Sequence, residues 1–201
     1  MVVKTVRVGR MQENCYIAID EETKVGVLVD PGEEADKIEK ELTSLGVKLE
    51  AIILTHCHFD HVGAVDEIKA NHPEIDIYVS EIDYEYVKMD NSGLFGKFNS
   101  EVKFVEENKY VEIGPFKFKT IFTPGHSKGS VCFLHEDILF SGDTLFRETV
   151  GRTDLLGSSH EEIIDSVNNK LMLLDDKIEV YPGHGYSTTI KHERHNNPFV
   201  I

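Results

Sequence analysis

Four side chains that commonly bind metals lie close together in the short run T-H-C-H-F-D-H. Residues two apart in an extended backbone face the same way, so His56 and His58 can point at one centre. Asp60 and His61 begin the next turn of the chain and can present a carboxylate and an imidazole to a neighbouring centre. Histidines gathered without a shared partner would repel one another when charged and would be costly to bury. The run therefore predicts a metal site in preference to a polar loop with a capping aspartate.

Three more ligand-type side chains each follow an apolar stretch in a turn that contains glycine. They are His126 in T-P-G-H, Asp143 in S-G-D and His184 in P-G-H. Such turns place side chains at the ends of strands, and glycine lets the backbone come close to the centre. A set of five histidines and two aspartates, with no thiolate, favours zinc, with iron or manganese as alternatives. Since seven ligands exceed one tetrahedral site, the sequence predicts two divalent metal ions.

Strands and helices must bring these residues together. Apolar runs, helical spacing and turn residues predict strands at 2–8, 14–19, 25–29, 49–55, 75–79, 102–105, 116–122, 131–135, 138–140 and 178–181, and helices at 34–45, 62–71, 81–89 and 160–174. Strands followed by helices in both halves predict an α/β (α+β) fold of packed sheets covered outside by helices. No repeat or linker interrupts the chain, so we expect a single domain over residues 1–201.

The composition is that of a soluble globular protein, with 40% hydrophobic and 28% charged residues. A net charge of -15 without a cluster of Lys and Arg argues against nucleic acid and anionic membrane as partners. No uncharged apolar run approaches the roughly 18 residues of a membrane helix, and the N-terminus lacks a signal-peptide core. The three cysteines are far apart and form no disulfide framework, so we expect a cytoplasmic protein.

These motifs resemble the metallo-β-lactamase fold superfamily and, within it, the glyoxalase II-like (hydroxyacylglutathione hydrolase-like) hydrolases. The resemblance covers nearly the whole chain, from N-C-Y and D-P-G through T-H-C-H-F-D-H and S-G-D-T-L-F to the C-terminal G-H-G and N-P-F. It implies a four-layer αββα sandwich with the metals at one edge of the two sheets. The C-terminal helical domain that completes the glutathione site in two-domain enzymes is expected to be absent.

The resemblance also implies a role for each ligand. It assigns the first metal to His56, His58 and His126, the second metal to Asp60, His61 and His184, and the bridging position to Asp143. True β-lactamases of this fold commonly carry Cys or Ser at the bridging position, so the aspartate argues against antibiotic hydrolysis. We also expect Asp60 and Asp143 to take part in catalysis by orienting the water or accepting its proton, as ligands first and bases second.

Two cations in such a site lower the pKa of a shared water and polarise a carbonyl, which predicts a metal-dependent hydrolase. A thioester fits best, because its thiolate leaving group needs no strong general acid. The expected substrate is therefore a small acyl-thiol resembling S-lactoylglutathione. The alternatives are a mononuclear iron persulfide dioxygenase of the same fold, a phosphodiesterase, which the acidic charge disfavours, and a non-catalytic binding module.

The expected substrate contact is Arg152. The glyoxalase II pattern has Gly-Lys-x-Tyr soon after the bridging aspartate, and this chain has G-R-T-D at the corresponding place. Arg152 keeps the cation, whereas Asp154 stands where the phenol would be. Arg152 is therefore expected to bind a substrate carboxylate, with a surface ion pair to Asp154 as the alternative.

Overall fold

Two six-stranded sheets form the centre of the computed structural model, which describes residues 1–201. The first sheet has the order β1 (Val2–Val8), β2 (Glu13–Ile19), β3 (Val25–Val29), β4 (Lys48–Ile53), β5 (Asp76–Val79) and β6 (Lys103–Phe104). The second has the order β14 (Thr188–Thr189), β13 (Glu179–Pro182), β10 (Ile138–Gly142), β9 (Val131–His135), β8 (Phe116–Phe122) and β7 (Tyr110–Ile113). A separate ribbon pairs β11 (Leu145–Phe146) with β12 (Thr149–Val150).

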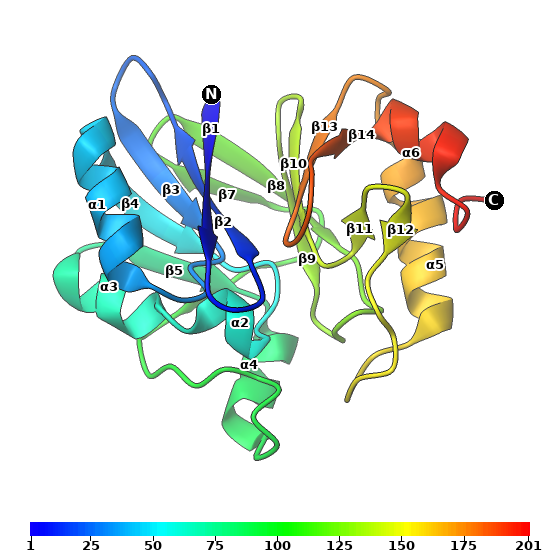
Figure 1. Cartoon of the computed structure of the whole chain (residues 1–201), viewed down its shortest axis with the longest axis horizontal. Helices are drawn as coiled ribbons and strands as arrows, with labels where there is room; N and C mark the ends of the chain where they lie inside the picture. The colour runs from blue at the N-terminus through cyan, green and yellow to red at the C-terminus, as the bar shows by residue number, and fades with distance from the viewer.

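Helices cover the outer face of each sheet, as Figure 1 shows. Four helices connect strands of the first sheet. They are α1 (Ala35–Leu45) between β3 and β4, α2 (Phe59–Val62) and α3 (Val65–Asn71) between β4 and β5, and α4 (Glu81–Met89) between β5 and β6. The second sheet is covered by α5 (His160–Asn169), the short 3₁₀ helix η1 (Leu171–Leu173) and α6 (Ile190–Asn196). No helix combines the length and the apolar character that crossing a membrane would require.

Three hydrophobic clusters fill the spaces between these layers. One joins strands of the first sheet to α1 and α3, and another joins strands of the second sheet to α5 and α6. The third lies between the sheets and contains residues such as Val27, Ile53, Phe118 and Phe140. Each sheet is covered on both faces, and side chains alternate between the faces along a strand. The central strands are therefore apolar at nearly every position. Three clusters between four layers confirm the predicted αββα sandwich.

Parallel strand directions bring several strand ends to one edge. In the first sheet β3, β4 and β5 are parallel. In the second, β8 and β10 both run antiparallel to β9, and β13 runs parallel to β10. The carboxyl ends of β4, β8, β10 and β13 are therefore positioned to carry the histidine and aspartate turns, which follow these four strands in the sequence.

Each expected strand and helix is present, with differences at the ends that have local causes. The strand expected over 49–55 ends at Ile53, because the Thr55 amide donates to Asp30 Oδ1 at 2.7 Å instead of continuing a sheet ladder. The helix expected over 62–71 divides into α2 and α3, because the Ala64 amide donates to the Pro31 carbonyl.

Other differences involve the second half of the chain. The helix expected over 160–174 stops at Asn169, and Lys170 leaves helical geometry with its ammonium group donating to the Phe122 carbonyl. Two substantial elements were not predicted, the edge strand β7 and the helix α6. The N-terminal cap of α6 is Thr189, whose hydroxyl accepts from the His192 amide.

Candidate metal centre

The predicted ligands gather in two groups at the edge where the strand ends meet. His56 and His58 follow β4 and His126 follows β8, and their ligand atoms lie within 4.8 Å of one another. The other group joins Asp60 and His61 of α2 to His184, which follows β13, within the same limit. Each group thus contains residues from both sheets, and the structure brings together the sets expected for the two metals.

Asp143, at the end of β10, faces both groups. Its Oδ2 lies 3.5 Å from His126 Nε2 in the first group and 3.7 Å from His184 Nε2 in the second. Its Oδ1 lies 3.5 Å from His61 Nε2. The carboxylate therefore occupies the position that a ligand shared by two cations would need.

Buried polar atoms without partners indicate that cations fit here. His56 Nε2, His61 Nε2 and Asp143 Oδ1 are buried and have no hydrogen-bond partner. Nitrogen atoms of His58 and His126 face each other at 2.9 Å, an arrangement in which at most one proton can lie between them. Unpaired buried groups are costly, and histidine with carboxylate is the donor set that zinc and iron accept. The residues present fit two divalent metal ions.

Asp30 supports the centre without taking the position of a ligand. It also lies near His56 and His61, but its oxygens are already engaged. Oδ1 accepts from the Thr55 amide, while Oδ2 accepts from the Thr55 hydroxyl at 2.5 Å and lies 3.0 Å from His61 Nδ1. A carboxylate on Nδ1 leaves Nε2 of the imidazole free to bind a metal. In the sequence, Asp30 is recognisable only as part of the D-P-G turn.

Two other predicted ligands are oriented by neighbouring polar atoms. His126 Nδ1 lies 3.0 Å from the Arg152 carbonyl oxygen, and His56 Nδ1 lies 3.1 Å from the Thr55 hydroxyl. Accepting atoms beside Nδ1 leave the opposite ring nitrogen available to a metal. The main chain of Arg152 thus has a structural role that differs from the substrate contact expected of its side chain.

Asp83 of α4 is a further supporting carboxylate that the sequence did not reveal. Its Oδ2 accepts from the Cys57 amide at 3.0 Å and from the Ser127 hydroxyl at 2.8 Å, and its Oδ1 accepts from the Gly129 amide at 2.7 Å. Cys57 separates His56 from His58, and Ser127 follows His126. One buried side chain therefore fixes both segments of the first ligand group. Burial raises the pKa of Asp83 to about 6, so it is ionised at neutral pH.

The two ligand groups differ in their protonation. Burial and neighbouring imidazoles lower the pKa of His58 to about 3 and that of His56 well below its usual range, so both are neutral. Burial also lowers the pKa of His61, but the Asp143 and Asp30 carboxylates outweigh it and raise the value to about 9. For Asp60, the hydrogen bond from His184 outweighs burial and lowers the pKa to about 2.

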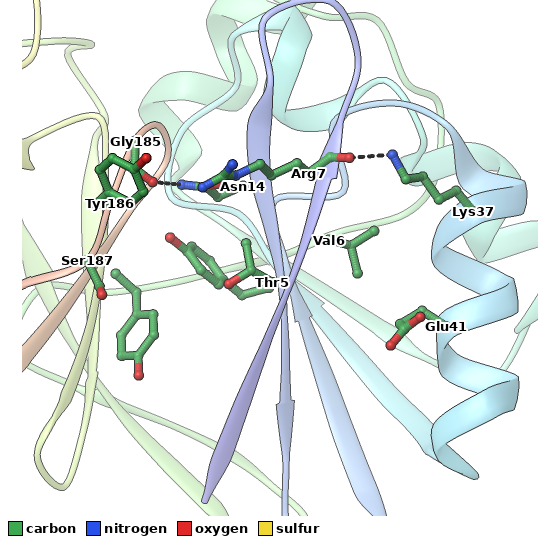
Figure 2. A pocket seen from close by; sticks show the side chains of 11 residues that line it. Thr5, Val6, Arg7, Asn14, Lys37, Glu41, Gly185, Tyr186 and Ser187 are labelled. Carbon is green, nitrogen blue, oxygen red and sulfur yellow. Dashed lines mark hydrogen bonds between the residues drawn. The ribbon is translucent and has the colours of Figure 1, made fainter.

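Hydrogen bonds from two side chains of β2 position the loop that carries His184. Asn14 Nδ2 donates to the carbonyl oxygens of Pro182 at 3.0 Å and Gly185 at 3.1 Å, the second of which is drawn in Figure 2. Tyr16 donates its hydroxyl to the Pro182 carbonyl at 2.6 Å. The hollow of about 600 Å³ in Figure 2 borders this loop but is lined by none of the predicted ligands.

Gly183 is required by the close packing of the centre. A Cβ atom at this position would lie 2.3 Å from Asp143 Oδ1 and 2.6 Å from His61 Cε1. Carbon and oxygen cannot approach so closely, and any larger residue would displace a predicted ligand. Glycine thus lets the loop of His184 pass directly beside the bridging carboxylate.

A second hollow of about 340 Å³ opens directly onto the ligands. It is lined by predicted ligands from both groups together with Arg152 and five apolar side chains. Arg152 donates from Nε to Asp154 Oδ1 at 2.7 Å and from Nη2 to Asp154 Oδ2 at 2.8 Å. The residue therefore lies at the pocket as expected, and the ion pair foreseen as its alternative is also present.

The remaining histidines and Cys57 lie apart from the ligand groups. His72 pairs with Glu39 and His192 pairs with Glu148, while Cys57 is buried in the cluster between the first sheet and its helices. The other histidines outside the ligand groups are His135, His160 and His195. The five histidines not predicted as ligands thus belong to neither group.

Glu13 is a buried carboxyl beside the centre whose oxygens both lack hydrogen-bond partners. Burial, reinforced by the charges of Asp30, Asp143 and Asp60, raises the pKa of Glu13 well above its usual range. A raised pKa in the folded state contributes stability that is present below the unfolded value of about 4.3 and is lost as the pH rises.

Replacing Glu13 with Gln should remove this pH dependence. In the metal-free protein, the free energy of unfolding of Glu13→Gln relative to the wild type should rise between pH 5 and pH 8. In this range Glu13 is ionised in the unfolded wild type, so folding must either return a proton to its carboxyl group or bury its charge. Glutamine requires neither. Urea unfolding in the presence of a chelator measures the difference at each pH. An unchanged difference across this range would contradict the assignment.

Asp83→Asn should weaken the first ligand group. The amide has one acceptor oxygen where the carboxylate has two, so at least one of its three donors loses its partner, and we expect a loss of about 1–3 kcal/mol in stability. Zinc affinity, measured by competition with a chromogenic chelator, should also fall. Asp66→Asn is the matched control, because Asp66 accepts from the amides of Asn99 and Ser100 away from the metal centre. Equal zinc affinities in the two variants would refute the positioning role.

Comparison with known proteins agrees with this geometry. The model of the metallo-beta-lactamase superfamily matches residues 8–184. The probable metallo-hydrolase YqgX of Bacillus subtilis (strain 168) is 36% identical over 202 residues, covering 96% of this chain and 94% of the relative. The hydroxyacylglutathione hydrolase GloC of Haemophilus influenzae is 32% identical over 210 residues, covering 100% of this chain and 98% of the relative.

Solved structures with the same fold also cover nearly the whole chain. The crystal structure of BLEG-1 B3 metallo-beta-lactamase has a TM-score of 0.91 and 34% identity, with 99% of each chain covered. The crystal structure of TTHA1623 in a di-iron-bound form has a TM-score of 0.87 and 34% identity, covering 98% of this chain and 100% of the other. The family match, the fold and the two ligand groups agree that this chain belongs to the metallo-β-lactamase superfamily.

Proposed function

We propose that this protein is a dinuclear metal hydrolase that cleaves small acyl thioesters. The observation on which the proposal rests is the position of Asp143, whose carboxylate faces His126 and His184 of different ligand groups at 3.5 and 3.7 Å. A carboxylate in this place suits a pair of cations that act on one substrate. Superfamily membership and the metallo-hydrolase relative support hydrolysis as the reaction class.

The ligands are proposed to divide as the groups do. His56, His58 and His126 would hold one ion and Asp60, His61 and His184 the other, with Asp143 shared. When bound, the two ions would lower the pKa of a water and polarise the scissile carbonyl. Zinc is the metal we favour for this donor set, and the di-iron form of TTHA1623 makes iron the principal alternative.

The residues of the chain would orient the reactants. Asp60 is ionised, since its pKa is lowered to about 2, and its Oδ2 lies 3.2 Å from His184 Nε2. Asp60 and Asp143 would therefore act first as ligands and then as acceptors for the proton of the attacking water. The three free cysteines are all buried, and Cys57 belongs to an apolar cluster, so none is placed to act as a nucleophile.

A thioester suits this pocket because the pocket offers no evident acid to protonate a strongly basic leaving group. Apart from the predicted ligands, its charged lining consists of Arg152. A thiolate leaves without such help. The similarity to GloC supports the same class. Buried, unpaired cysteines are consistent with the cytoplasmic location that we propose, and the net charge of -15 supports a small-molecule partner over nucleic acid.

Metal analysis and turnover test the proposal together. Purified protein should contain about two divalent ions per chain, and thioester hydrolysis, followed by release of free thiol, should stop with a chelator and return with zinc or manganese. Turnover that persists in the chelator would exclude the mechanism. One iron per chain, with oxygen uptake when glutathione persulfide is added, would instead support the dioxygenase alternative. Incubation of the same protein with a chromogenic cephalosporin tests β-lactam hydrolysis.

Asp143→Asn should lower metal content and reduce kcat by more than about a hundredfold, because even residues that only support metal ligands contribute ten- to a hundredfold. His195→Ala is the control, since His195 is exposed and lies on α6 outside both ligand groups. Metal content is measured by inductively coupled plasma mass spectrometry on both variants. Full metal content and full activity in Asp143→Asn would overturn the shared-ligand assignment.

A further inference from the structure

The pocket beside the ligand groups has an apolar rim. The side chains that form it are Met11, Phe59, Leu94, Phe146 and Leu155. They come from the turn between β1 and β2, from α2, from the segment after α4, from β11 and from the segment before α5. Met11 and Phe59 are 56% and 43% exposed, although both are large apolar residues. The other three are half-buried. Single exposed apolar residues need no explanation, but five apolar side chains that line one pocket beside polar groups mark a binding surface.

The same pocket offers little to an anionic group away from the metals. Arg152 is its only positively charged residue beyond the ligand histidines, and two guanidinium donors are already bound by the two oxygens of Asp154. This paired-oxygen geometry is the one a substrate carboxylate would itself use on Arg152. A carboxylate must therefore displace Asp154 or remain beside it, and Asp154 repels it in either case.

We propose that the apolar rim and the Arg152–Asp154 pair together select thioesters whose thiol portion is apolar and uncharged, over those of a carboxylate-bearing thiol such as glutathione. This inference rests on the proposed function and narrows its substrate class. Asp154 contributes to this specificity, because it occupies the cation that a carboxylate would need. Phe59 and the other rim residues supply the apolar contact.

The expected size of the effect follows from the exposure of the ion pair. The side chains of Arg152 and Asp154 are 64% and 69% exposed. Exposed pairs of this kind contribute little, so removing Asp154 should strengthen the binding of a carboxylate-bearing thiol by at most about fivefold. Most of the preference for an apolar thiol should therefore come from the rim.

Thiol binding tests the inference independently of turnover. Calorimetric titration of the zinc-loaded protein should give a tighter Kd for benzyl mercaptan than for glutathione, with N-acetylcysteamine, an uncharged amide thiol, between them. Asp154→Asn should tighten glutathione binding about two- to fivefold and leave benzyl mercaptan unchanged. Phe59→Ser should weaken benzyl mercaptan more than glutathione. The control is Asp137→Asn, which breaks an ion pair to Lys177 outside the pocket and should change neither Kd.

The outcomes separate this inference from the proposed function. Glutathione bound more tightly than benzyl mercaptan, or an Asp154→Asn variant identical to Asp137→Asn, would overturn the selectivity, even if thioesters are hydrolysed. Absence of hydrolysis for every thioester, with the expected order of thiol affinities intact, would remove the proposed reaction and still support the apolar, carboxylate-excluding pocket.

Discussion

The centre depends on one buried carboxylate at the junction of two strands. Asp30 follows β3, and its oxygens bind the amide and hydroxyl of Thr55 beyond β4 and face Nδ1 of His61 in α2. These contacts end β4 early, turn the chain toward the ligand run and fix one imidazole with its other nitrogen directed at Asp143. Leaving a buried carboxylate oxygen unpaired is costly, so the loss of any of these contacts would disturb the others.

The gathering of the predicted ligands could be foreseen because the relevant information is local. His56 and His58 lie beyond the end of β4 but keep the two-residue spacing expected of extended backbone, and each later candidate ligand is marked by a glycine turn after an apolar strand. The supporting residues carry no such signal. Asp83 binds Cys57, Ser127 and Gly129, which are 26, 44 and 46 residues away, so only the packed structure reveals it. A short edge strand such as β7 also depends on a neighbour, because four residues give little pattern of their own and strand preference varies with context.

The two ligand groups would accept a cation in different ways. In the first group burial already keeps His56 and His58 neutral, so each imidazole can offer a lone pair to a metal without first losing a proton. In the second group the carboxylates hold protons on His61, whose pKa is raised to about 9. A metal there must replace protons, which makes its binding the more sensitive to acid. The candidate ligands can be named from the sequence, whereas this asymmetry arises from the three-dimensional arrangement of the acids.

Each ligand group combines residues from both sheets, with His126 and His184 from the second and the others from the first or from the turn that follows β4. Hydrogen bonds already join the two sheets beside the centre, because Asn14 and Tyr16 of β2 donate to the carbonyl oxygens of Pro182 and Gly185 next to the apolar inter-sheet cluster. Cations coordinated at the edge would act as cross-links between the N-terminal and C-terminal halves of the chain. Loading the centre would then add metal–ligand bonds to these hydrogen bonds, so that separating the two sheets would require release of the metals.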